Sequence, residues 1–155
     1  MKINRLSLLS SLFSVINENN QDDSNYVLAH YFIDELVANN ISPIATLYHY
    51  DMPLWVDEKL GGWRNREIID AFEHYVKVCF EEFGDRVKYW LSINEQNMQI
   101  CYGEWLGVDK GCTDWSKEKW KINHIMNLCH AKAVIACHEL VEDGKIGPVP
   151  GYVPI

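Results

Sequence analysis

From residue 24 onwards the chain alternates two hydrophobic patterns, one with helical spacing and one with consecutive apolar residues. The first helical pattern covers residues 24–38, with Ser24 as the expected N-cap and two asparagines at its end. Its apolar positions predict one helical face, formed by Val27, Leu28, Tyr31, Phe32, Leu36 and Val37. Residues 42–48 carry no charge and predict a buried parallel strand.

The clearest helical pattern covers residues 65–83. We expect Asn65 to cap this helix and Gly84 to take the left-handed position after its last turn. Its apolar stripe consists of Ile68, Ile69, Phe72, Tyr75, Val76, Cys79, Phe80 and Phe83. Residues 87–93 predict the next strand.

A long loop is expected over residues 94–114, followed by a third helix over about residues 116–141. The stripe of this helix is Ile122, Ile125, Met126, Cys129, Ala133, Ala136, Cys137 and Leu140. Gly144 ends it, and residues 145–155 start another extended segment. Alternating helices and strands predict a parallel α/β fold with right-handed crossovers. In such folds chemistry is found in the loops after the carboxyl ends of the strands.

Asn94 and Glu95 end one of these apolar strands, at the face where sites form. A carboxyl group among aromatic side chains there would have a raised pKa and could hold a proton at neutral pH. The alternative is a glutamate that solvates or caps the loop, because an isolated Asn-Glu pair is a common sequence.

Tyr48, His49, Tyr50 and Asp51 follow the preceding strand. A histidine between two tyrosines offers hydrogen bonds together with flat apolar rings, which is the combination that binds sugars. The alternative is a core histidine that is hydrogen-bonded to the backbone.

Composition limits the partners. The chain has 155 residues, a formal net charge of −8 and 48% hydrophobic residues, which is typical of one folded domain. No basic patch is available for nucleic acid or an anionic membrane, and no segment reaches the ~18 apolar residues of a membrane span. The apolar residues 6–16 after a basic start resemble a signal peptide, but no small-x-small cleavage site follows.

An odd number of cysteines favours reduced thiols and a cytoplasmic location. They are Cys79, Cys101, Cys112, Cys129 and Cys137. We expect no metal site at the Cys129–His130 and Cys137–His138 pairs, because ligand sets usually combine closer pairs from separate elements. Buried cysteines and solvated histidines are the simpler interpretation.

Four segments together resemble the family-1 glycoside hydrolases, which include β-glucosidases and 6-phospho-β-glucosidases. They are TLYHYDMPLWV (46–56), GGWRNREIIDAFEHY (61–75), FGDRVKYWLSINE (83–95) and HAKAVIACHE (130–139). The resemblance implies a (β/α)8 TIM barrel that cleaves β-linked glycosides with retention, using two glutamates and no cofactor. It covers residues 24–155, whereas residues 1–23 match poorly and form a separate N-terminal segment.

The resemblance also implies roles for single residues. Glu95 matches the general acid/base, Asn94 its neighbour that contacts the sugar 2-hydroxyl, and His49 the glycone-binding histidine. Tyr50 stands where many members have tryptophan, and Gln96 stands where many have proline. These two departures favour the branch that acts on 6-phospho-β-glucosides. Arg5 faintly matches an arginine of the second barrel strand.

The family's nucleophile belongs to a Thr-Glu-Asn-Gly type of segment, which this sequence lacks. The resemblance therefore implies a fragment with about strands 2–5 of the barrel, carrying the general acid/base only. Open sheet edges predict self-association or a complementary chain that supplies the other half of the barrel. The alternative is a non-catalytic remnant, or a sugar-binding or structural module without turnover.

Overall fold

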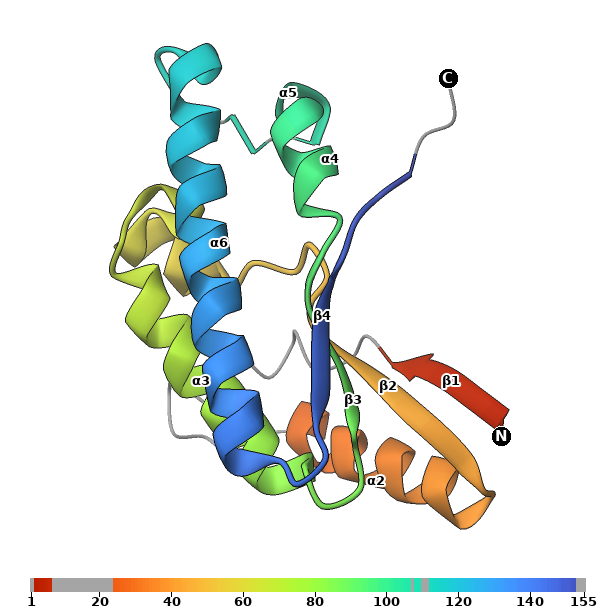
Figure 1. Ribbon diagram of the computed structural model, residues 1–155. Helices are drawn as coiled ribbons and strands as arrows, with labels where there is room; N and C mark the ends of the chain where they lie inside the picture. The colour runs from red at the N-terminus through yellow and green to blue at the C-terminus, as the bar shows by residue number, and fades with distance from the viewer. Residues whose placement is uncertain (1, 7–23, 107, 110–111, 153–155) are drawn as a thin grey trace.

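A computed structural model of the protein describes residues 2–6, 24–106, 108–109 and 112–152. Its centre is a parallel sheet in which the spatial order of the strands, β1-β2-β3-β4, equals their order in the chain (Figure 1). The strands are β1 (Lys2–Leu6), β2 (Ile41–Tyr48), β3 (Tyr89–Asn94) and β4 (Lys145–Val149). The parallel α/β prediction is confirmed, and its three strands after residue 24 lie close to the predicted positions.

The registers bring the carboxyl ends of the strands together. Leu6 lies opposite Ala45 in the β1–β2 pair, and Tyr48 lies opposite Ile93 in the β2–β3 pair. The β3–β4 pair is irregular between Leu91 and Asn94, where the register shifts.

Three long helices connect the strands: α2 (Ser24–Ala38), α3 (Ile68–Phe83) and α6 (Trp115–Leu140). Figure 1 shows α3 and α6 side by side along the sheet. The predicted loop over residues 94–114 is wrong in part, because it contains α4 (Gln96–Cys101) and α5 (Gly103–Leu106). The loop after β2 likewise contains two short helical turns, η2 (Val56–Leu60) and η3 (Gly62–Arg64). Helices this short hold too few turns to show a period in the sequence.

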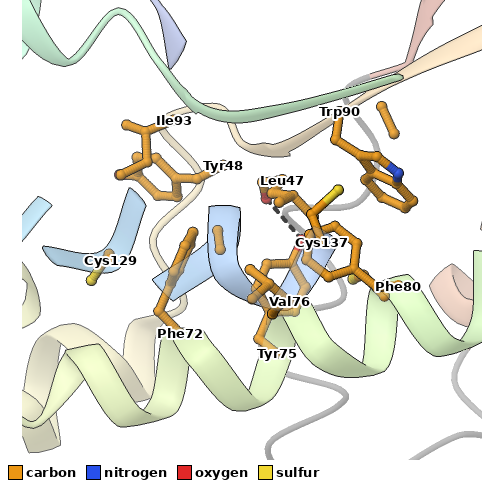
Figure 2. Packing of buried hydrophobic residues seen from close by; sticks show 14 of the residues in the cluster. Leu47, Tyr48, Phe72, Tyr75, Val76, Phe80, Trp90, Ile93, Cys129 and Cys137 are labelled. Atoms are coloured by element: carbon orange, nitrogen blue, oxygen red, sulfur yellow. Dashed lines mark hydrogen bonds between the residues drawn. The ribbon is translucent and has the colours of Figure 1, made fainter. Parts of the chain in front are cut away.

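The core lies between the sheet and the helices. All eight residues of the predicted α3 stripe are buried, as expected. Figure 2 shows Phe80 of α3 against Trp90 of β3, with ring centroids 4.8 Å apart. The hydroxyl group of buried Tyr75 donates a hydrogen bond to the Leu47 carbonyl oxygen at 2.7 Å, which ties α3 to β2 (Figure 2).

The predicted face of α2 is wrong. Its members Val27 and Tyr31 are 61% and 60% exposed, whereas Ala29 and Ile33 are buried. The helix is apolar around most of its circumference, so spacing alone does not identify the side that packs. The face that packs on β2 is the one with the smaller side chain of Ala29, which allows a close approach.

The helix ends differ from prediction in three details. Helix α3 begins at Ile68 with Glu67 at the N-cap, whereas the predicted cap Asn65 accepts a hydrogen bond from the Glu67 amide at 3.1 Å, one turn earlier. Gly84 has φ −67°, so it is not a left-handed cap. A Cβ atom there would lie 2.3 Å from the Phe80 carbonyl oxygen and 2.8 Å from Val141, so the position needs glycine because it is crowded. Leu140, the last residue of the predicted α6 stripe, is 40% exposed, and the neighbouring Val141 is buried instead.

Candidate active site

The irregularity of β3 directs neighbouring side chains to different partners. Ser92 Oγ forms a hydrogen bond of 2.7 Å with His130 Nδ1 of α6. Asn94, two residues later, accepts a hydrogen bond from the guanidinium group of Arg5 in β1. A regular strand would direct both side chains to the same face of the sheet. The register shift between Leu91 and Asn94 separates them, as bulges beside functional sites commonly do.

Arg5 and Asn94 form a polar group at the carboxyl ends of β1 and β3. Arg5 Nε also donates to Thr46 Oγ1 of β2 at 3.1 Å, so one arginine connects three strands. Asn94 is only 2% exposed, and its carbonyl oxygen accepts a hydrogen bond from Gln99 Nε2 at 3.3 Å. The Gln99 bond holds the Asn94 backbone, and burial together with the Arg5 bond orients the Asn94 side chain. The faint match of Arg5 thus marks a residue that the structure brings to the candidate site.

Glu95 and Tyr50 contact each other next to the Arg5–Asn94 pair. The Tyr50 hydroxyl donates a hydrogen bond of 2.7 Å to Glu95 Oε2. Both residues have left-handed backbones, with φ 45° at Glu95 and 70° at Tyr50. Such conformations are rare for residues other than glycine and cluster at functional sites. Burial and the bond to Glu95 raise the pKa of Tyr50 well above its ordinary value, so its hydroxyl stays protonated and can donate.

His49 completes the predicted set. It is half-buried, and its ring centroid lies 5.6 Å from that of Tyr50. A cavity of about 200 Å³ opens beside Tyr50, with Trp63, Arg64 and Gln99 in its wall. The structure thus brings Tyr50 and Glu95 into contact, with Asn94 and His49 as their chain neighbours.

Several polar contacts around Glu95 could not be predicted from local sequence. The Glu95 amide donates to the Val149 carbonyl oxygen of β4 at 2.6 Å. The Asn97 side chain donates to the carbonyl oxygen of Gly151 and accepts from its amide, both at 2.8 Å. The expectation that His130 is solvated is wrong: it is half-buried against Ser92, and burial lowers its pKa. The only hint in the sequence is the density of Asn and Gln after Glu95.

Within the part of the chain that the structure describes, no group of three or more His, Cys, Asp or Glu side chains could hold a metal ion. No helix among those residues is long and apolar enough to cross a membrane.

A parallel α/β sheet with a carboxyl group, a buried amide and aromatic side chains at the carboxyl ends of its strands has the architecture of barrel enzymes. The profile of Glycosyl hydrolase family 1 matches residues 17–153. The chain belongs to this family. The predicted partial (β/α)8 barrel is confirmed by solved members, including the β-glucosidase from Thermotoga maritima in complex with glucoimidazole. That enzyme superposes on 95% of this chain with a TM-score of 0.81 and 37% identity.

Two relatives from Bacillus subtilis (strain 168) show the same likeness in sequence. The aryl-phospho-β-D-glucosidase BglC is 41% identical over 129 residues, which cover 82% of this chain. The 6-phospho-β-glucosidase GmuD is 36% identical over 154 residues, which cover 99% of it. The chain spans 27% and 32% of these two relatives and 33% of the Thermotoga enzyme.

Proposed function

We propose that the chain supplies the general acid/base half of a retaining β-glycosidase that acts on β-glucosides or 6-phospho-β-glucosides. The observation that carries this proposal is the hydrogen bond from Tyr50 to Glu95 at the end of β3. It fixes one carboxyl oxygen, so the other can face a glycosidic oxygen. In a retaining enzyme such a carboxyl group protonates the departing oxygen and then deprotonates the attacking water.

The neighbouring residues would bind the sugar. Asn94 uses its side-chain oxygen to accept from Arg5, so its NH2 group, which lies beside the Tyr50 hydroxyl, is the part that would donate to a sugar hydroxyl. His49 and Tyr50 would contact the glycone from the loop after β2, with a ring face and polar atoms.

The second carboxylate must come from another part of the barrel. Retaining hydrolysis requires a nucleophile about 5–5.5 Å from the acid/base. The chain spans about a third of its relatives, and the nucleophile segment expected from the family resemblance is absent from its sequence. We therefore propose that turnover requires the rest of the barrel, joined covalently or as a complementary chain. A cytoplasmic location fits the five unpaired cysteines.

The test is reconstitution. The chain is mixed with a separately produced polypeptide that contains the part of GmuD that the chain does not match, and hydrolysis of an aryl β-glucoside and of its 6-phosphate is measured. We expect restored hydrolysis, and we expect Glu95→Gln to lower its kcat by roughly 10²–10⁴-fold, as for loss of a general acid/base. Glu104→Gln in α5 is the matched control, because Glu104 is exposed and close in sequence. Restored activity that is equal in the Glu95→Gln protein would refute the assignment.

A non-catalytic sugar-binding module is the second candidate. Trp105 of α5 is 90% exposed, and an indole at the end of the sheet that carries the site could stack on a sugar ring. This alternative predicts no turnover in any mixture, together with sugar binding that quenches tryptophan fluorescence and is lost in Trp105→Ala.

A further inference from the structure

Helix α6 carries a line of polar side chains that faces the segment with Glu95. Asn123, Asn127 and His130 follow one another at spacings of four and three residues, so they share one face of the helix. We call these three residues the α6 polar stripe. It runs beside the buried apolar residues that join α6 to the core. Polar groups beside a core usually have partners, so the bonds of the stripe indicate its role.

Each member of the stripe bonds to the segment of residues 92–96. The Gln96 side-chain NH2 group lies 2.9 Å from Asn123 Oδ1, 2.9 Å from Asn127 Oδ1 and 3.2 Å from the Asn123 carbonyl oxygen. His130 Nδ1 lies 2.7 Å from Ser92 Oγ. The two attachment points lie on either side of Asn94 and Glu95, and both lead to the same helix.

The geometry of Glu95 explains why such an attachment is needed. Residues other than glycine rarely adopt the left-handed backbone conformation of Glu95, and it persists only when contacts with the surrounding structure hold it. Glu95 makes no side-chain cap to α4, and α4 has only six residues, so this helix supplies little rigidity of its own. The bonds of Gln96 to a 26-residue helix supply an external support.

We propose that the α6 polar stripe is the positioning element of the acid/base segment, with Gln96, Asn123 and Asn127 as its principal contact. These residues act through Glu95 and touch no substrate, so they are positioning residues. Their importance for catalysis rests on the proposed function of Glu95. Their effect on the conformation of the Glu95 backbone is independent of that function.

Asn127→Ala provides the cleanest test. Asn127 is exposed, and alanine is the better helix former, so α6 should not be weakened. Amide hydrogen exchange of the 155-residue chain, followed by NMR, reports on the Glu95 amide that bonds to Val149. Loss of one hydrogen bond to Gln96 should speed exchange at Glu95 about fivefold, while the urea midpoint stays unchanged or rises. His124→Ala, at another exposed position of α6, is the control and should leave the Glu95 amide unchanged.

A double-mutant cycle decides whether the stripe acts through Gln96. Gln96→Ala alone should speed exchange at Glu95 by about five- to thirtyfold, and adding Asn127→Ala should change it no further. Unchanged exchange at Glu95 in Asn127→Ala and Gln96→Ala would overturn the proposal. Equal acceleration of all amides, with a lower urea midpoint, would also overturn it, because the contact would then serve the whole fold. If Glu95 proved inert in reconstitution, these exchange results would still stand.

Discussion

Replacing Tyr75 with phenylalanine removes a single oxygen atom from the centre of the core. The Tyr75 side chain is fully buried, and its hydroxyl donates to the Leu47 carbonyl oxygen near the end of β2, just before His49 and Tyr50. The substitution keeps the ring and its packing against Phe72, whose centroid lies 5.9 Å away. The effect measured is therefore that of the hydroxyl group and its contacts, the hydrogen bond to Leu47 and the contact with the Cys79 thiol.

The expected loss of stability follows from the buried carbonyl oxygen that remains without its partner. Without the hydroxyl group, the Leu47 carbonyl loses a buried partner, and an unsatisfied buried acceptor costs about 1–3 kcal/mol. Part of this free-energy cost is offset in the phenylalanine variant, because no hydroxyl group has to be removed from water when the chain folds. We expect the free energy of unfolding to fall by about 1–2 kcal/mol, and the midpoint temperature by roughly 2–8 °C for a chain of this length.

Urea unfolding followed by tryptophan fluorescence measures this change, and an unchanged m-value shows that the midpoint reports stability. Tyr31→Phe in α2 is the control, since Tyr31 is 60% exposed and its loss of a hydroxyl should change stability by less than about 0.5 kcal/mol. Equal effects of the two substitutions would refute the reasoning, because the Tyr75 bond would then contribute nothing net.

Three further predictions concern the pH dependence of stability, the tight packing around Gly84 and hydrogen exchange in the sheet. Burial raises the pKa of Cys137 to about 11 and that of Cys129 to about 12. In the unfolded chain these thiols lose their protons at a lower pH of about 8.5. The free energy of unfolding should therefore fall as the pH rises from about 8.5 towards 11–12. Urea midpoints between pH 8 and 11 measure this fall, which Cys137→Ala should reduce and Cys101→Ala, at an exposed position, should not. Gly84→Ala should destabilise by about 1–3 kcal/mol in urea unfolding, because its Cβ would overlap backbone, whereas Gly147→Ala has open space and should cost nothing. Hydrogen exchange should be slowest at the amides of β2 and β3, which pair on both sides, and equally fast exchange throughout the sheet would contradict the strand order.

The long elements could be predicted from the sequence because their patterns are unambiguous. The α3 stripe has apolar residues on one side only, and all of it is buried. In α2 the apolar residues surround most of the helix, so the pattern could not choose between the Val27 face and the Ala29 face. The position of Gly84 predicts a cap, whereas the reason for the glycine is crowding by the Phe80 carbonyl oxygen and by Val141, the second of which is distant in the chain.

The candidate site was predictable to the extent that it follows strand ends. His49, Tyr50, Asn94 and Glu95 each follow or end a strand, and parallel strands bring such residues together. Their roles remain predictions. The contact of Arg5 with Asn94 spans 89 residues, and that of Gln96 with Asn127 spans 31. Contacts of this kind depend on register and helix rotation, which local patterns do not contain.

The match between strand order and chain order has a consequence for synthesis. Because β1 to β4 lie in the sheet as they occur in the chain, every new strand finds its neighbour already made when it leaves the ribosome. Since the chain is synthesised from its N-terminus, each strand can pair with the strand before it without waiting for a later segment. The Glu95 amide has to wait, because its acceptor on Val149 emerges much later, so the backbone of the reactive carboxyl residue is among the last parts to become fixed.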